Sequence, residues 1–166
     1  VGGGTLRDVL LDRNPVFWIA DGTYILIAVG AAGLVFFTAH LVESRLRWVM
    51  WLDSFALAVA VPAGVGVAMA LEQPALIVVL MGMVTGCMGG LIRDVVVNEV
   101  PLVLKQGELY VSAAFAGALL AVALRTFELP LWAALVGCGA LTWTLRAGSL
   151  QFGWSLPVYR ARPPRS

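Results

Sequence analysis

The sequence predicts an all-α membrane protein, built from an inverted repeat of three-helix units plus one extra C-terminal helix. Three observations lead to this fold class. Of the 166 residues, 60% are hydrophobic and only 13% are charged, whereas about a quarter of the residues of a soluble domain are charged. The apolar residues form long charge-free stretches, and a charged motif occurs twice. A soluble domain of this size could not bury so much apolar surface.

Five apolar stretches approach or reach the roughly 20 residues that a helix needs to cross the hydrocarbon core of a membrane. They are continuously apolar rather than alternating, which disfavours a transmembrane β-barrel. Residues 1–11 are expected to be the end of a further, partial span. The five full spans are Gly22–Val42, Ser54–Leu71 (extended back by Trp48–Leu52), Gln73–Ile92, Leu109–Leu124 and Leu129–Leu145.

Positive charge is distributed unevenly between the two sides of the membrane. The side that follows the partial span holds Arg7, Arg13 and Arg125, and the opposite side holds the other eight arginine and lysine residues, Arg146 among them. Because cytoplasmic loops carry the excess of positive charge, the C-terminus is predicted to lie in the cytoplasm. The chain is then a multi-pass protein of the cell membrane.

The motif Gly-Gly-x-x-Arg-Asp-Val-x5-Pro-x8-Tyr begins at Gly3 and again at Gly89, 86 residues later. Three spans lie between the two copies, and an odd number of crossings inverts the second copy relative to the first. Inverted repeats of three helices are common in transporters and also occur in channels. The motif therefore predicts that this architecture organises the chain.

The repeat divides the chain into four parts. Residues 1–44 are interpreted as the remnant of the first three-helix unit, and residues 45–128 as the complete, inverted second unit. Residues 129–147 form the extra helix, and residues 148–166 form a cytoplasmic tail. Projection of the second copy onto the first places one further helix before residue 1, about 40 residues of chain, so that the whole protein is expected to have seven spans.

Glycines gather just before both copies of the charged pair. Each glycine costs about 1 kcal/mol relative to alanine inside a helix, so adjacent glycines are expected to break the helix. A break frees backbone carbonyls, which can bind a partly dehydrated alkali cation. The alternative is a face of small residues for close helix packing. The predicted pathway glycines are Gly2, Gly3, Gly4, Gly86, Gly89 and Gly90.

A charged pair follows each group of glycines, as Arg7-Asp8 and as Arg93-Asp94. Adjacent helical residues point about 100° apart, so neither pair is expected to be simply a local ion pair. Each pair is either a charged gate near one mouth of an ion path or a clamp that pins the helix through charge-assisted hydrogen bonds. Lys105 is assigned to the same gate or clamp.

Asp53 stands about one turn inside an apolar span, where a carboxylate needs hydration or a partner. It is predicted to attract cations to the cytoplasmic mouth, to pair with Arg93 or Lys105, or to sit favourably in the first turn of its helix. Tyr24 and Tyr110 are interpreted as part of an interfacial aromatic belt.

Several functional classes are excluded by composition. One histidine and two cysteines are too few for a zinc site or a disulfide framework. A net charge of +1 provides no basic excess for nucleic acid. Hydrolytic catalysis needs a nucleophile with a base in reach, and no such set is visible. The chain is therefore not expected to be an enzyme or to bind a cofactor.

The second motif copy, residues 89–104 followed by Glu108-Leu109-Tyr110, resembles the bacterial branch of the trimeric intracellular cation (TRIC) channel family. The resemblance covers the chain up to about Gly153. It implies a homotrimer in membrane lipid with one pore inside each subunit, K⁺ or another monovalent cation as the permeant ion, and a pore lined by the glycines above and by Asp53. Ala56 and Ala60 depart from the glycine and phenylalanine of the bacterial relatives, which would change the pore width.

The sequence thus predicts a monovalent cation channel, with K⁺ as the expected ion. The main alternative is a secondary transporter of a small neutral solute such as glycine, because alternating access is built on the same symmetry. A carrier needs a closed midplane site for both carboxylate and ammonium groups, and Asp53 lies too shallow for the ammonium. A non-transporting membrane scaffold is the third hypothesis.

Overall fold

The computed structural model describes residues 1–42, 46–104 and 109–155 of the chain. These residues are almost entirely helical and contain no β-strand, which confirms the predicted all-α class. The elements are α1 (Gly2–Leu10), α2 (Phe17–Ala20), α3 (Thr23–Val42), α4 (Leu46–Ala70), α5 (Ala75–Val96), the 3-10 turn η1 (Leu102–Leu104), α6 (Val111–Thr126) and α7 (Leu131–Phe152).

Each predicted full span corresponds to one long helix, and two of these helices, over Trp48–Ala70 and Ala75–Val96, are long and apolar enough to cross a membrane. The segments Thr23–Thr38 and Val111–Thr126 are apolar but shorter. The last helix is longer than predicted, because α7 continues beyond residue 147. It ends where Gly153 adopts a left-handed conformation with φ of 68°, which glycine tolerates without a Cβ clash.

Arg146 does not mark the cytoplasmic end of the last helix, as its place in the charge count implied. It lies inside α7 and is fully buried, with its guanidinium 5.0 Å from the centre of the Tyr110 ring. A cation over an aromatic face is attracted by the ring quadrupole. This contact holds the C-terminal part of α7 against the start of α6.

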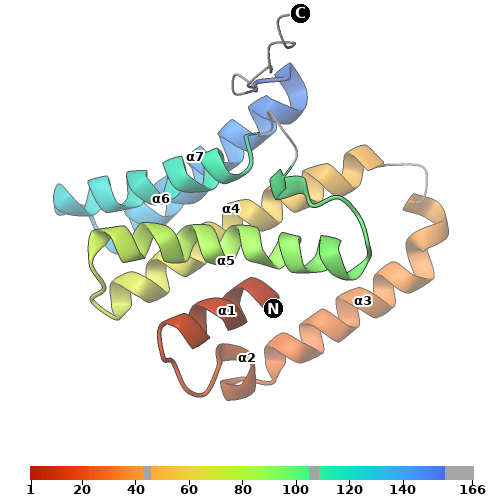
Figure 1. Cartoon of the computed structure of the whole chain (residues 1–166), viewed down its shortest axis with the longest axis horizontal. Coiled ribbons are helices and arrows are strands. Elements are labelled where there is room, and N and C mark those ends of the chain that lie inside the picture. Colours follow the sequence, from red (N-terminus) through yellow and green to blue (C-terminus); the bar gives the residue numbers. More distant parts are fainter. Residues whose placement is uncertain (43–45, 105–108, 156–166) are drawn as a thin grey trace, which may run out of the picture.

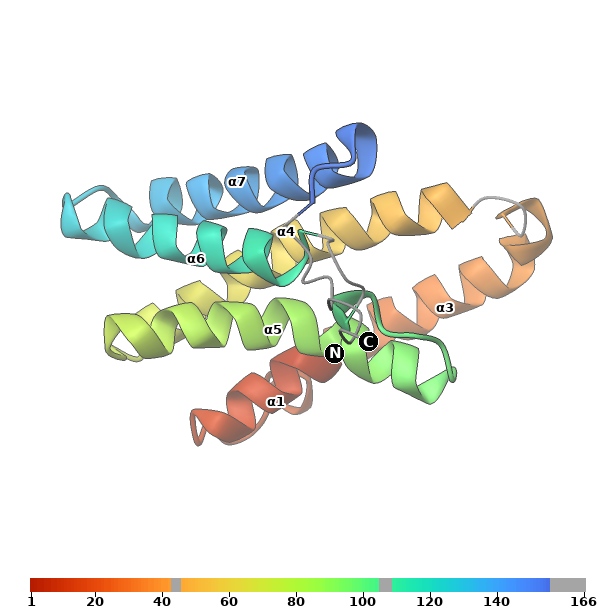
Figure 2. The ribbon, with the colours of Figure 1, turned by 45° about the horizontal axis from the view of Figure 1, so that its top comes forward.

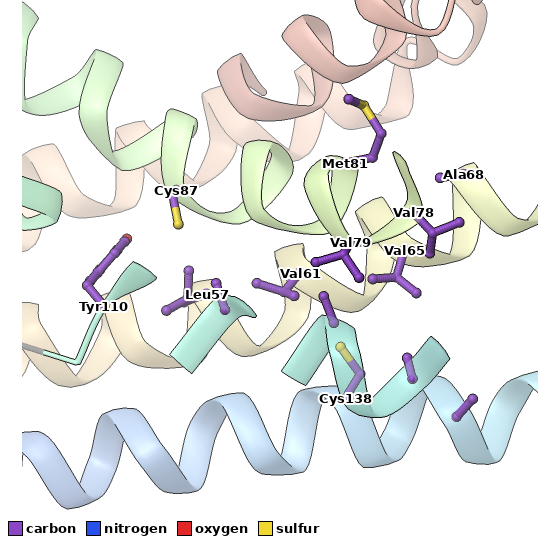
Figure 3. Close-up of a cluster of buried hydrophobic side chains, with 14 residues drawn as sticks. Leu57, Val61, Val65, Ala68, Val78, Val79, Met81, Cys87, Tyr110 and Cys138 are labelled. Atoms are coloured by element: carbon purple, nitrogen blue, oxygen red, sulfur yellow. The ribbon is translucent and has the colours of Figure 1, made fainter. Parts of the chain in front are cut away.

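The core of the bundle is centred on α4, which packs against α5, α6 and α7. Leu57, Val61 and Val65 of α4 follow one another at intervals of four residues, so they share one face of the helix, and all three are buried. Figure 3 shows them in a row between the neighbouring helices, with Cys138 of α7 close by. The periodicity of buried side chains therefore sets the orientation of α4.

Helix α3 lies away from this core (Figures 1 and 2). Its apolar side chains are exposed in this chain, for example Leu26 at 73% and Phe36 at 78%. A helix that is apolar on all sides needs an apolar environment on all sides. Lipid or further protein fits the surface of α3, and water does not.

The two motif copies end their helices in the same way. Asp12 and Asn98, which are equivalent positions of the repeat, both take a left-handed φ, 51° and 57°. The backbone N–H of Arg13 donates to the Asp8 carbonyl at 2.8 Å, and that of Glu99 donates to the Asp94 carbonyl at 2.9 Å. The same sequence therefore produces the same local helix end twice.

Helices α1 and α5 pack side by side and run in opposite directions (Figures 1 and 2). A Cβ at Gly3 would lie 3.1 Å from the Gly89 nitrogen, and a Cβ at Gly89 would lie 3.6 Å from the Gly3 nitrogen. Equivalent residues of the two copies therefore meet at the crossing, which is consistent with an inverted repeat.

Candidate functional site

A cavity of about 750 Å³ lies between α1, α2, α4 and α5, and Tyr110 closes one part of its wall. Its size is that of a small-molecule site. The structure brings the residues predicted for the ion pathway together on this wall. They are Gly2, Gly3, Gly4, Gly86, Gly89, Gly90 and Asp53, together with Arg7 and Arg93 of the two charged pairs.

The predicted helix breaks at the glycines are wrong. Helix α5 is continuous from Ala75 to Val96, and α1 is continuous from Gly2 to Leu10. The backbone groups that a break would free therefore remain within regular helix, and they do not supply free carbonyl ligands. The close-packing alternative describes this part of the chain better.

Glycine is needed at these positions because a side chain would collide with a neighbouring helix, and not because the helix backbone is broken. A Cβ at Gly3 would collide with the backbone oxygen of Thr85, and a Cβ at Gly86 would lie 2.5 Å from Cγ2 of Val61 and 3.0 Å from Cδ1 of Leu57. Only glycine allows α1 and α4 to approach α5 so closely. The cavity lies where these three helices cross.

The first charged pair is a buried clamp. Nε and Nη2 of Arg7 contact Oδ1 of Asp8 at 2.8 Å and 2.6 Å. Oδ2 of Asp8 accepts the backbone N–H of Phe17 at 2.8 Å, and the Phe17 ring lies 5.5 Å from the guanidinium. The arginine side chain folds back onto its neighbour, and Asp8 also binds Phe17 nine residues later, so the pair is not simply a local ion pair and acts as a clamp.

The second charged pair repeats this arrangement and extends it. Nε and Nη2 of Arg93 contact Oδ1 of Asp94 at 2.8 Å and 2.7 Å, and Oδ2 of Asp94 accepts the backbone N–H of Leu102 at 3.0 Å. In addition, Nη1 of Arg93 donates to Oδ1 of Asp53 at 2.9 Å. Both copies thus fasten a helix end to the following turn, as the clamp interpretation requires. A gating role stays a prediction for both pairs.

Asp53 pairs with Arg93, which confirms one of the predicted alternatives. It lies seven residues after the start of α4 at Leu46, so it is about two turns inside the helix rather than one. Its side chain is only 5% exposed. The second oxygen, Oδ2, is buried without a hydrogen-bond partner among the described residues. Lys105, the other predicted partner, lies outside the described residues.

Two residues of the cavity wall were missed by sequence reasoning. Tyr110 is only 3% exposed and borders the cavity, so its assignment to an aromatic belt is wrong. Its place in the repeated motif was the signal that could have identified it. Thr85 also borders the cavity, and its hydroxyl donates to the Met81 carbonyl one turn earlier at 2.6 Å. No feature of the sequence distinguishes Thr85 from other small residues in α5.

The cavity wall carries charged side chains of both signs. Three arginines, Arg7, Arg13 and Arg93, border it. Asp8, Asp53 and Asp94 bind these arginines, and Asp21 is a further carboxylate on the wall. Hydrogen bonds from the side chain and backbone of Thr23 hold the pKa of Asp21 below its ordinary value, so its charge persists at neutral pH. The wall itself therefore carries two aspartates and three arginines, and Asp8 and Asp94 balance two of these arginines from outside the wall.

Comparisons with known proteins agree on one group of membrane proteins. The sequence profile of the family described as "Glycine transporter" matches residues 1–40 and 50–126. The UPF0126 inner membrane protein YadS of Escherichia coli K12 is 38% identical over 164 residues, which span 96% of this chain and 77% of that protein. The UPF0126 membrane protein YvgT of Bacillus subtilis is 31% identical over 94% of this chain and 76% of its own length.

Solved structures of similar proteins have the same fold. The TRIC trimeric intracellular cation channel orthologue from Rhodobacter sphaeroides superposes with a TM-score of 0.88, at 38% identity, over 92% of this chain and 78% of that one. A second structure, reported for conductance through TRIC cation channels, superposes with a TM-score of 0.87, at 25% identity, over 98% of this chain and 79% of that one. The chain shares both fold and sequence with these proteins.

Proposed function

The chain belongs to the bacterial branch of the TRIC channel family, and we propose that it conducts monovalent cations, with K⁺ as the principal ion, through the cavity inside each subunit. The observation that carries this proposal is the position of Asp53. Its nearly buried carboxylate, one oxygen of which has no hydrogen-bond partner within the described part of the chain, borders a cavity of about 750 Å³ between apolar helices. A buried carboxylate favours a cation that enters such a cavity.

In this proposal the pathway glycines make room for the ion because they have no side chains, and their backbone carbonyls do not bind it. Gly2, Gly3, Gly4, Gly86, Gly89 and Gly90 border the cavity without side chains. Ala56 and Ala60 continue the same small-residue wall on α4. Small walls give room for a cation that keeps part of its hydration shell, and the carboxylates of Asp21 and Asp53 supply the charge.

The wider context of the channel belongs to the same proposal. The Rhodobacter sphaeroides structure is described as a trimeric intracellular cation channel, and the Escherichia coli relative is described as an inner membrane protein. A homotrimer in the cell membrane, surrounded by lipid, with a cytoplasmic C-terminus, accounts for these similarities and for the excess of positive charge on one side. Two inverted three-helix units and the additional α7 form each subunit.

The test uses the full-length gene product in planar bilayers that separate two K⁺ concentrations. We expect discrete currents that reverse near the K⁺ equilibrium potential and that become less selective for cations in Asp53→Asn. The matched control is Arg125→Gln, which removes a charge at an exposed site at the end of α6. Silent bilayers combined with saturable uptake of labelled glycine into liposomes would refute the channel and support a carrier.

A further inference from the structure

The Asp53 carboxylate interacts with Arg93 and with the Tyr110 side chain, but one of its two oxygens has no partner within hydrogen-bond distance among the described residues. Its Oδ1 accepts Nη1 of Arg93 at 2.9 Å, and its buried Oδ2 has no hydrogen-bond partner among the described residues. Burial of a carboxylate is unfavourable unless both oxygens find partners. The carboxylate is therefore incompletely satisfied, and because Oδ2 is buried, a further cation would have to compete for Oδ1.

The arginine that binds Asp53 is held mainly by another residue. Arg93 directs two of its nitrogens to Asp94 and only Nη1 to Asp53. Its side chain is 47% exposed, whereas the side chain of Arg7 in the equivalent position is 6% exposed. Arg93 can thus withdraw from Asp53 while it stays bound to Asp94, and Arg7 has no comparable freedom.

Gly90 leaves a space at the point where polar groups converge. A Cβ at this position would lie 3.1 Å from the Tyr110 hydroxyl, 3.9 Å from Nη2 of Arg93 and 4.0 Å from Oδ1 of Asp53. The Tyr110 ring is itself fixed, because it is buried and stacked under Arg146. Oδ1 of Asp53, the oxygen that also accepts Arg93, and the Tyr110 hydroxyl oxygen therefore lie at one small gap, and oxygen atoms are the ligands that alkali cations prefer.

We propose that Asp53 and Tyr110 form a binding site for a partly dehydrated monovalent cation at the gap left by Gly90, and that Arg93 is its internal competitor. The inference rests on the proposed function, because the bound cation is the one that permeates. The guanidinium and the cation need the same carboxylate and repel each other, so they occupy it in turn. The single charge of the Asp53 carboxylate compensates either the Arg93 guanidinium or the cation, but not both at once.

The test measures cation binding without measuring current. The full-length protein in detergent is unfolded by heat in KCl or in N-methyl-D-glucamine chloride at equal ionic strength, and tryptophan fluorescence reports the transition, since the 166 residues given contain six tryptophans. A cation that binds only the folded protein raises Tm as its concentration rises. The organic cation is too large for the gap and controls for ionic strength.

Removal of the competitor is expected to strengthen binding. In Arg93→Gln the K⁺ concentration at half of the maximal shift in Tm falls about tenfold, which is the factor that one competing charge-assisted hydrogen bond accounts for. Asp53→Asn abolishes the K⁺ dependence, and Gly90→Ala weakens it by filling the gap. The control, Gly66→Ala, lies outside the cavity where α4 faces Leu135 of α7, and it keeps the wild-type K⁺ dependence.

Arg93→Gln by itself could unfold the protein, because it leaves its partner carboxylate without a countercharge. Two further variants therefore keep the proposal testable. The double variant Asp53→Asn with Arg93→Gln removes both charges and is expected to elute like the wild type and to show no K⁺ dependence. Arg93→Lys retains the charge but cannot reach both carboxylates, and it is expected to bind K⁺ more tightly than the wild type does.

The possible outcomes test the cation-binding site independently of ion conduction. An unchanged K⁺ midpoint in Arg93→Gln and Arg93→Lys, or a K⁺ dependence that survives in Asp53→Asn, would overturn the site even if bilayers show K⁺ currents. A lowered midpoint in a protein that is silent in bilayers would keep the site and remove the proposed conduction.

Discussion

The crossing of α4 and α5 makes a sharp prediction at Gly64. A Cβ at this buried position would lie 2.5 Å from the Met81 carbonyl oxygen and 2.7 Å from Cβ of Thr85, and it would collide with the Thr85 hydroxyl. In the same helix, a Cβ at Gly66 would meet only the methyl ends of Leu135, at 3.3 Å and 3.6 Å. Gly64→Ala is therefore expected to destabilise the protein, and Gly66→Ala is its matched control.

The magnitude follows from which atoms can move. The Met81 oxygen belongs to the backbone and Thr85 Cβ cannot change rotamer, so relief requires α4 and α5 to separate. Overpacking of this kind costs about 1–3 kcal/mol, and here the upper end applies. Alanine returns about 1 kcal/mol at most through helix propensity. The net loss in the free energy of unfolding is about 2 kcal/mol for Gly64→Ala, whereas for Gly66→Ala the change is within about 1 kcal/mol of zero.

Thermal unfolding of both variants in one detergent, followed by tryptophan fluorescence, measures this difference. For a chain of this length, about 2 kcal/mol lowers Tm by roughly 4–8 °C. Size-exclusion elution in parallel separates reduced stability from altered assembly. Equal Tm values for Gly64→Ala and the wild type, or equal losses in the two variants, would refute the close-packing explanation of these glycines.

Three further predictions concern the clamp and the cavity. Asp8→Asn keeps a hydrogen-bond acceptor for the backbone N–H of Phe17 but leaves the buried Arg7 without a countercharge. It should therefore reduce the free energy of unfolding by about 3–5 kcal/mol in chemical unfolding. A loss below about 1 kcal/mol would show that the pair is not a clamp. Ala60→Phe places a ring in the cavity wall and should lower the single-channel current at least severalfold. Val136→Phe, at an exposed apolar site, should leave the current unchanged. Equal currents in the two variants would show that ions do not pass through this cavity. Ala56→Cys in a background without the two native cysteines should react with a water-soluble thiol reagent and lose current, and a lack of reaction would mean that water does not reach this wall.

Much of the fold was accessible from the sequence because it depends on local rules. Continuous apolar stretches located the long helices, since only helices satisfy their own backbone hydrogen bonds in lipid. The repeated motif identified two helix ends, and its aspartates act alike in both copies, Asp8 on Phe17 and Asp94 on Leu102. The pairing of Asp53 with Arg93 was one of the predicted alternatives, because a carboxylate within an apolar span needs a partner.

Other features depended on contacts that no local pattern specifies. The glycines of α5 were expected to break the helix, but Val61 and Leu57 of α4 occupy the space that side chains at Gly86 would need. Tyr110 was assigned to the membrane interface, but Arg146 of α7 covers its ring and holds it at the cavity. In both cases the neighbour that decides the outcome lies in a different helix.

By itself, the sequence determined that this chain is a helical membrane protein with a doubled Gly-Gly-x-x-Arg-Asp motif, because hydropathy and spacing act along the chain. Only the tertiary structure decided that the glycines serve helix crossings, that Arg93 binds both Asp53 and Asp94 whereas Arg7 binds Asp8 among the described residues, and that the gap at Gly90 faces Asp53 and Tyr110. The physical reason is that steric fit and charge pairing depend on atoms brought together from distant parts of the chain.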